Sequence, residues 1–217
     1  MNLEQARFNM IEQQIRPWEV IDQGVLDLLF VVKREEFVPQ AYRLLAFADI
    51  EIPLGHDASM LPPKIEAHAL QALRVAKSDK VLEIGSGSGY MAALLAAHAA
   101  HVWSVDIVPE LTEMARANLK RQDIGNVTLE TGDAVCGWPA HAPYDVIMVS
   151  GSVPVVPPEL LAQLKVGGRM FAIVGELPAM QAQLIVRTGE DACNSVTLFE
   201  TVVPALANAP QPARFVF

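Results

Sequence analysis

Val-Leu-Glu-Ile-Gly-Ser-Gly-Ser-Gly-Tyr, at residues 81–90, is the stretch that decides how this chain folds. An apolar segment passes through Glu83 into three glycines at alternate positions, and a second apolar segment, Met91 to Ala100, follows directly. Glycines allow turns that a Cβ would block and let a ligand approach the backbone closely. The start of a helix behind them offers free N–H donors. The pattern is therefore typical of the first strand–turn–helix unit of a nucleotide-binding α/β fold.

The glycine spacing indicates which nucleotide such a turn would bind. A dinucleotide site has the spacing G-x-G-x-x-G, whereas here the third glycine comes one position earlier and Tyr90 follows it. The segment resembles motif I of the S-adenosylmethionine (SAM) methyltransferases, Glu-x-Gly-x-Gly-x-Gly. A glycine-rich loop without a ligand is the alternative, and the order of strand, turn and helix argues against it. The resemblance implies a SAM site that includes Glu83, Gly85, Ser86, Gly87 and Gly89.

Composition restricts the class of protein. The 217 residues are 52% hydrophobic, which allows a sizeable core in one domain or two small ones. A net charge of −9 argues against a nucleic-acid partner. We find no apolar run of ~18 residues and no basic N-terminal region followed by an apolar stretch, so we expect a cytoplasmic protein without a membrane partner. Cys136 and Cys193 are predicted to be free thiols, and the scattered histidines suggest no metal site.

The pattern of apolar residues differs between two parts of the chain. Residues 1–78 predict a helical cap and substrate-loop region, and residues 79–217 the SAM-binding core, together forming one compact unit. In the first part, helical spacing relates Phe8, Ile11 and Ile15, and again Val25, Leu28, Leu29 and Val32. Residues 49–63 look irregular, and a helix is expected to start at Pro63.

From Lys80 onward, strand and helix patterns alternate, as in a parallel sheet covered by helices on both faces. The fold prediction is α/β: a doubly wound, mostly parallel, seven-stranded Rossmann-like sheet with an N-terminal helical extension. Helices are expected near residues 89–98, 109–121 and 157–165, the last one ended by a glycine pair. Strands are expected at residues 81–84, 101–106, 127–130, 145–150, 169–174, 183–187 and 195–203. The segment 204–212 is expected to wrap as coil.

The strand ends carry the candidate ligand-binding residues. Asp106, followed by Ile107, could accept hydrogen bonds from both ribose hydroxyls of a nucleoside, although an acid at this place also serves NAD. In Gly132-Asp133-Ala134 the carboxylate could accept from an adenine amino group, which favours SAM. Ser150 ends the fourth strand at the crevice where α/β sheets bind ligands. Asp145, at the other end of that strand, is expected to be structural, and Trp138 to be a core anchor rather than a pocket wall.

Four further segments narrow the resemblance. They are Arg34-Glu35-x-Phe37-Val38-Pro39, Gly132-Asp133-Ala134 with Gly137-Trp138-Pro139, Ala142-Pro143-Tyr144-Asp145, and Gln163-Leu164-Lys165-x-Gly167-Gly168-Arg169. Together, these motifs resemble the protein-L-isoaspartate O-methyltransferase family over roughly residues 5–175. The resemblance implies a SAM-dependent enzyme that esterifies the carboxylate of isoaspartyl residues in damaged proteins, acting as a monomer or weak dimer.

The chain departs from the family where the acceptor would be held. The family carries a Thr-Ile-Ser-x-Pro segment facing the reacting methyl group, and in this chain Ser59 takes the threonine position and Leu61 the serine position. The family's C-terminal Phe-Val-Pro-Leu pattern is also altered, at residues 202–206. Ser59 and Leu61 are the candidate substrate-loop residues. Either the active-site hydroxyl is missing or Ser59 supplies it.

This departure leaves three functions open. The leading interpretation is an isoaspartyl-type carboxyl methyltransferase. The second is a SAM-dependent methyltransferase of a small molecule, and the third a SAM-binding protein without catalysis. An NAD-dependent oxidoreductase is disfavoured because the glycine spacing differs.

Overall fold

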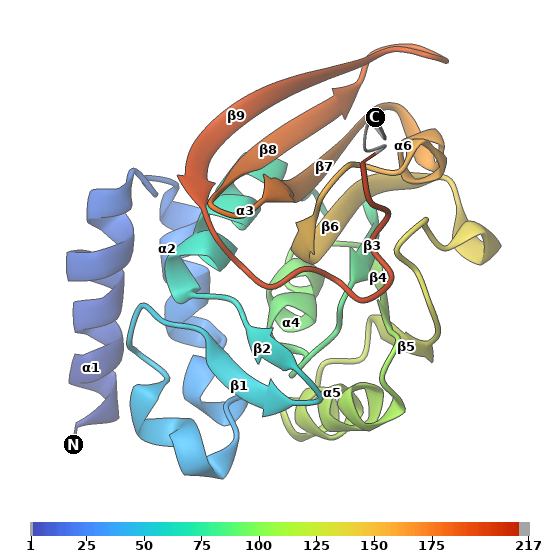
Figure 1. The fold of residues 1–217 in the computed structure, drawn as a ribbon. Coiled ribbons are helices and arrows are strands. Elements are labelled where there is room, and N and C mark those ends of the chain that lie inside the picture. The colour runs from blue at the N-terminus through green and yellow to red at the C-terminus, as the bar shows by residue number, and fades with distance from the viewer. Residues whose placement is uncertain (1, 213–217) are drawn as a thin grey trace.

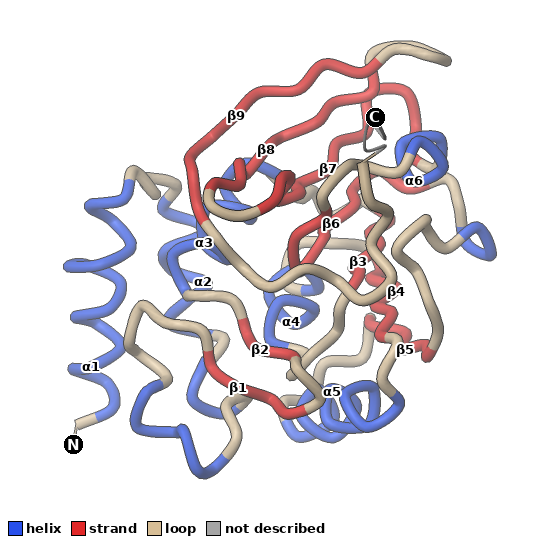
Figure 2. Tube along the Cα trace, in the orientation of Figure 1, coloured by secondary structure: helices blue, strands red, loops and turns tan. Residues whose placement is uncertain are grey.

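One twisted sheet organises the molecule, as Figures 1 and 2 show. In the computed structural model, which describes residues 2–212, the sheet has seven strands in the order β5-β4-β3-β6-β7-β8-β9. The pairs among β3 to β7 are parallel, and β7–β8 and β8–β9 are antiparallel. The predicted fold class is confirmed. The strands are β3 (Lys80–Ile84), β4 (His101–Asp106), β5 (Val127–Thr131), β6 (Tyr144–Val153), β7 (Leu164–Glu176), β8 (Ala179–Arg187) and β9 (Cys193–Thr201).

Helices cover both faces of the sheet because its central strands are apolar on both sides. Along β6, Val146 and Met148 join one core cluster, and Ile147 and Val149 join the other. A strand buried on both faces reads as a continuous apolar run, which is what the sequence shows here. The first cluster lies under α3 (Pro63–Leu73), α4 (Tyr90–Ala96) and α5 (Pro109–Arg121), and the second is covered in part by α6 (Pro158–Ala162).

The N-terminal part is less regular than its sequence predicts. α1 (Leu3–Asn9) continues as a π-helical turn, Met10–Ile15, and a 3₁₀ turn, Arg16–Trp18, before α2 (Gln23–Val31). The predicted face is confirmed for Ile11 and Ile15, which are fully buried, and is wrong for Phe8, which is 47% exposed while Met10 is buried. The wider π turn rotates the buried face away from the 3.6-residue pattern. The second predicted face is confirmed for its first three members, because Val25, Leu28 and Leu29 are buried.

Residues expected to be irregular form a β-hairpin. β1 (Ile52–Gly55) pairs with β2 (Ala58–Met60), and Figure 1 shows the hairpin below the sheet, on the side where β3 and β6 end. His56 and Asp57 connect the strands with φ angles of 55° and 57°. Two successive positive φ angles are the geometry of the tight turn that best matches hairpin twist. Gly55, which has a φ of 86°, ends β1 and leads into this turn.

The helix predicted at 157–165 ends earlier than expected. α6 stops at Ala162, and Leu164 already pairs with Tyr144 in the sheet. The glycine pair therefore does not end a helix. Gly167 has a φ of +83°, and a Cβ on Gly168 would lie 2.8 Å from the Lys165 carbonyl oxygen. The two glycines let the start of β7 kink where its register against β6 shifts.

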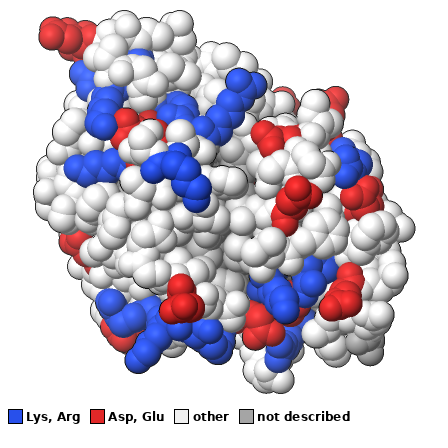
Figure 3. Space-filling model, turned by 180° about the vertical axis from the view of Figure 1, so that it is seen from behind, with Lys and Arg blue, Asp and Glu red and all other residues white. Residues whose placement is uncertain are grey.

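The surface and the described helices add two observations. Figure 3 shows Lys and Arg side chains interspersed with Asp and Glu on one face, around broad uncharged areas. No helix among residues 2–212 is both long enough and apolar enough to cross a membrane.

Candidate functional site

A cleft of about 350 Å³ lies where the central strands end, within the ~300–1,000 Å³ of small-molecule sites. The ends of β3, β4, β5 and β6 supply one side. The β1–β2 hairpin and residues 204–207 supply the other, and Figure 1 shows the C-terminal coil passing the strand ends with the hairpin below it. Most of the predicted site residues meet there: Ser59, Leu61, Gly85, Gly87, Asp106, Ile107, Gly132, Asp133, Ala134 and Ser150 line the cleft.

The glycine turn after β3 needs its glycines for different reasons. Gly85, Gly87 and Gly89 all have positive φ angles, of 93°, 50° and 82°. A Cβ on Gly87 would lie 3.1 Å from Leu54 of the hairpin, so this glycine allows the hairpin to approach the turn. Gly89 does not line the cleft. It allows close packing on α5, where a Cβ would lie 3.1 Å from Ala115.

Asp106 holds the turn in place. Its Oδ2 accepts a hydrogen bond from the Gly87 N–H at 2.9 Å, and its Oδ1 accepts from the Val108 N–H at 3.0 Å. Each carboxylate oxygen can accept a further bond, so the side chain remains able to take a ligand hydroxyl. Ile107, 38% exposed, presents an apolar wall beside it.

Asp133 is linked to the C-terminal segment. Its Oδ1 accepts from the Val135 N–H at 3.1 Å, and its Oδ2 accepts from the side-chain amide of Asn208 at 2.8 Å. Gly132 is required for a reason that the sequence did not show: a Cβ there would lie 2.7 Å from the Trp138 ring. Trp138 donates to Glu130 at 2.9 Å and packs against the second core cluster, which confirms its prediction as an anchor.

Glu83 lies behind the turn rather than in the cleft. It is fully buried, and it accepts hydrogen bonds from the hydroxyls of Ser104 at 2.5 Å and Ser150 at 3.1 Å. Burial raises the pKa of Glu83 from 4.5 to about 8, against the effect of both hydroxyls. Ser86 extends the chain of hydroxyls, since its Oγ lies 2.7 Å from that of Ser104. Glu83 and Ser86 line a second, smaller cavity that we call the inner cavity.

The two substrate-loop candidates lie side by side on β2 and just after it. The Ser59 hydroxyl donates to Glu51 at 3.2 Å. Leu61 is buried, and its carbonyl oxygen accepts a hydrogen bond from Arg34 at 2.7 Å. Both residues line the cleft and the inner cavity. A hydroxyl is thus available at the edge of the cleft, but it comes from Ser59 and not from position 61.

Residues 204–207 overlap the altered C-terminal pattern at 202–206, which the sequence placed near the acceptor, but the way they are held was not predicted. We expected coil there, and the segment does run as coil, but it is anchored on β6. The Ser152 N–H donates to the Pro204 carbonyl at 3.0 Å, and the Leu206 N–H donates to the Ser152 carbonyl at 2.9 Å. Leu206 then lies against the glycine turn, 3.4 Å from the place of a Cβ on Gly85. No local signal connects these positions, because they are more than fifty residues apart in sequence.

The hydrogen-bond acceptors and apolar walls of the cleft fit a nucleoside that carries a cationic end. Carboxylates of Asp106 and Asp133 stand beside apolar walls, which suits a sugar and a base, and a buried carboxyl lies behind the glycine turn. Among residues 2–212, no three His, Cys, Asp or Glu side chains are placed to hold a metal ion. Asp145 takes no part in the cleft. It accepts from the Lys80 N–H and pairs with Lys165 at 2.8 Å, the structural role predicted for it.

Comparison with known proteins gives a consistent match. The family model of protein-L-isoaspartate(D-aspartate) O-methyltransferase matches residues 5–207. The protein-L-isoaspartate O-methyltransferase of Gloeobacter violaceus is 38% identical over 93% of this chain and 99% of its own length. The protein-L-isoaspartate O-methyltransferase 2 of Pelobacter propionicus is 41% identical over 91% of this chain and 88% of its own length.

Solved structures agree on the fold. A protein-L-isoaspartate O-methyltransferase superposes with a TM-score of 0.80 at 28% identity, covering 93% of this chain and 66% of that one. A Plasmodium falciparum protein assigned to the same enzyme class, solved in complex with S-adenosyl-L-homocysteine, gives a TM-score of 0.80 at 18% identity, with coverage of 95% and 98%.

Proposed function

Because the chain belongs to the protein-L-isoaspartate O-methyltransferase family, we propose that its cleft binds SAM and that the enzyme transfers the methyl group to the carboxylate of an isoaspartyl residue. One observation carries the assignment of the site. The glycine turn after β3 and the Ser59–Leu61 segment of the family's acceptor loop line the same cleft. A donor held by the turn would therefore present its reactive end to an acceptor held by the loop.

The cofactor-binding residues follow from their positions. Asp106 would accept from the ribose hydroxyls and Asp133 from the adenine amino group, with Ile107 and Ala134 as apolar walls. The turn, Gly85 to Gly89, would allow close approach of the ligand, and Glu83 and Ser150 would lie beside its amino-acid end. When bound, SAM supplies a methyl group activated by a sulfonium.

The chain itself has little acid–base chemistry to perform. A free carboxylate has a pKa near ~4, so the acceptor is already ionised at neutral pH and needs no general base. What the protein must supply is orientation, which can contribute ~7–11 kcal/mol. The Ser59 hydroxyl and the backbone of the hairpin are the groups placed to orient the acceptor. Arg34 supports them by binding the Leu61 carbonyl.

An open groove beside the cleft favours a peptide acceptor over a small molecule. It has a volume of about 720 Å³ and shares Pro204 and Ala205 with the cleft. Leu177 and Val202, which are 73% and 46% exposed, lie along it. A chain extended through this groove could place one side chain in the cleft while its neighbours remain on apolar surface.

Methyl transfer to a synthetic peptide tests the proposal. A peptide containing one isoaspartyl residue, incubated with SAM, should form a base-labile methyl ester, and the same peptide with normal aspartate should not. Equal labelling of both peptides, or none of either with SAM bound, would contradict the repair function. A small-molecule acceptor or a SAM-binding role without catalysis would then lead.

The location, oligomeric state and partners of the enzyme stay predictions. We propose a cytoplasmic location, a monomer or weak dimer, and isoaspartyl proteins as partners. The acidic composition supports the absence of a nucleic-acid partner.

A further inference from the structure

The inner cavity lies at the glycine turn and adjoins the cleft. Its volume is about 30 Å³, enough for one water-sized group. It shares Ser59, Leu61, Gly85, Gly87 and Ser150 with the cleft, so a group attached to a ligand in the cleft could reach it. Polar side chains from three different elements meet at its walls: Glu66 of α3, Glu83 of β3 and Tyr90 of α4.

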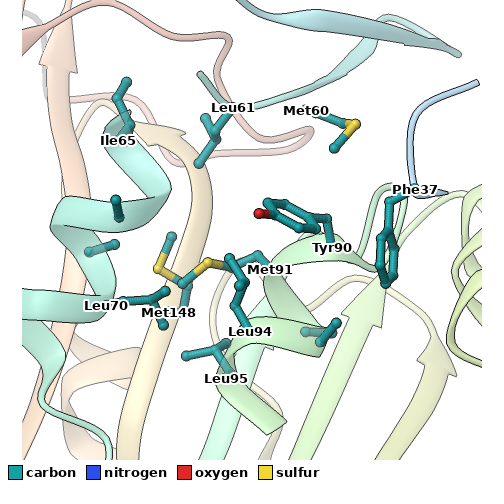
Figure 4. Close-up of a cluster of buried hydrophobic side chains, with 14 of the residues drawn as sticks. Phe37, Met60, Leu61, Ile65, Leu70, Tyr90, Met91, Leu94, Leu95 and Met148 are labelled. Carbon is teal, nitrogen blue, oxygen red and sulfur yellow. The ribbon is translucent and has the colours of Figure 1, made fainter. Parts of the chain in front are cut away.

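Two of these side chains have unused hydrogen-bonding capacity. Tyr90 is 1% exposed, and within residues 2–212 its hydroxyl has no hydrogen-bond partner. Figure 4 shows this hydroxyl pointing toward α3, on the side of Leu61 and Ile65. Glu66 is 3% exposed, and its Oε2 is paired with Arg34, while in the described part of the chain no hydrogen bond reaches its Oε1. A hydroxyl buried as that of Tyr90 is normally has a partner.

The charges around the cavity are unevenly balanced. Arg34 pairs with Glu66, and behind them Arg7 pairs with Glu35. Glu83 has no ion-pair partner among residues 2–212, only the hydroxyls of Ser104 and Ser150. The cavity wall therefore carries two carboxyl groups and a hydroxyl that can accept, and the basic side chain paired with Glu66 does not line the cavity itself. A compact cation with several N–H donors complements such a wall.

We propose that the inner cavity is a subsite for a primary ammonium group, and that Glu66 and Tyr90 share with Glu83 the binding of the α-ammonium of the methyl donor. The inference rests on the proposed function, because Asp106 and Asp133 would bind the nucleoside end of the same ligand. The amino-acid end of that ligand would then lie near the glycine turn. Glu66 is the new element. It sits on the helix that follows the altered acceptor loop, outside the glycine motif.

Binding of two ligands that differ in one group tests this subsite. S-adenosylhomocysteine and its deaminated analogue, in which hydrogen replaces the α-ammonium, are titrated calorimetrically into the wild type and three variants. Wild type should prefer the amine by at least thirtyfold. Glu66→Gln should reduce that preference by about tenfold, and Tyr90→Phe by about threefold, without weakening the deaminated analogue.

Glu35→Gln is the matched control. Glu35 is 2% exposed and paired with an arginine, as Glu66 is, but it does not line the inner cavity. It should leave the amine preference as in wild type. The proposal fails if Glu66→Gln and Tyr90→Phe keep the full preference, or if Glu66→Gln weakens both ligands equally. Tyr90→Phe removes only an unbonded hydroxyl, so it keeps the test decisive even if Glu66→Gln does not fold. Loss of all binding in wild type would instead contradict the proposed SAM site itself.

Discussion

The two sides of the cleft are built in opposite ways. The cofactor side consists of consecutive strand ends of one parallel sheet, each followed at once by its functional residues, as in Gly85–Gly89, Asp106 and Asp133. The acceptor side joins a hairpin, residues 52–60, to a coil at 204–207, segments about 150 residues apart that are held by a few backbone hydrogen bonds. Substitutions on the cofactor side should therefore cause large losses of SAM affinity, whereas substitutions on the acceptor side should cause smaller changes in the rate of methyl transfer.

The largest effect is expected at Gly87. Gly87→Val should weaken SAM binding by about a hundredfold or more, which corresponds to about 2.7 kcal/mol. The φ of +50° disfavours a β-branched residue, and the new side chain would press on Leu54 and fill the cleft. Calorimetric titration with SAM measures the loss, and circular dichroism checks the fold.

Gly125→Val is the control for this substitution. Gly125 is not in the left-handed region, and a Cβ there would have no heavy atom within 4 Å. The affinity of the Gly125→Val variant for SAM should equal that of wild type. If Gly87→Val also bound SAM with the affinity of wild type, the ligand would not approach the turn. The expected difference between the cofactor side and the acceptor side would then be contradicted.

A smaller loss is expected at Asp106. Asp106→Asn should weaken SAM about tenfold to a hundredfold, because a charge-assisted bond to a hydroxyl contributes ~1.5–3 kcal/mol. The amide oxygen can still accept from one backbone N–H, so the fold should survive. Asp145→Asn, at the opposite end of the sheet, should leave the dissociation constant unchanged. Equal effects of the two substitutions would remove Asp106 from the site.

The cofactor side could be predicted because its information is local. A buried strand, its final residue and the turn behind it are contiguous in sequence, and the carboxyl ends of parallel strands meet at one edge. Asp106, Asp133 and Ser150 were placed in this way, and all three line the cleft. Gly132 also lines the cleft as predicted, but the contact with Trp138 that requires a small residue there could not be predicted.

The acceptor side and the inner cavity could not be predicted because their contacts are long-range. Nothing near Leu206 shows that it would pack beside Gly85, and nothing near Glu66 shows that it would share a cavity with Glu83. The hairpin turn at His56 and Asp57 lacks the usual Asn-Gly or Asp-Gly signal. The π turn at Met10–Ile15 likewise has a sequence that reads as an ordinary helix.

The burial of Glu83 should make the cofactor side sensitive to pH. Its pKa is raised from 4.5 to about 8 by burial. Its stabilising contribution is therefore complete below pH 4.5 and is lost as the pH rises toward 8, by up to about 1.4 kcal/mol per pH unit. In urea denaturation of the ligand-free protein between pH 6 and 8, Glu83→Gln should gain stability relative to wild type as the pH rises. A constant difference across this range would mean that Glu83 is ionised in the folded protein.

The smallest effects are expected on the acceptor side, at Leu61. If the family's substrate is kept, Leu61→Ser should raise the rate of methyl transfer to an isoaspartyl peptide by up to about tenfold, since one hydrogen bond contributes ~0.5–1.5 kcal/mol. Affinity for SAM should not change. Leu61→Ala is the matched control, because it opens the same space without a hydroxyl, and it should not exceed the wild-type rate.

Ser59→Ala completes the comparison. The Ser59 hydroxyl lines the cleft and donates only to Glu51, so it is free to turn toward an acceptor. Its removal should lower the rate severalfold in wild type and less in Leu61→Ser, since the second hydroxyl would take over the same carboxylate. That non-additivity is the signature of two groups acting on one ligand. Independent effects of the two substitutions, or equal rates for Leu61→Ser and Leu61→Ala, would mean that the backbone of the hairpin alone orients the acceptor. The acceptor side would then tolerate side-chain change because its chemistry does not depend on a side chain.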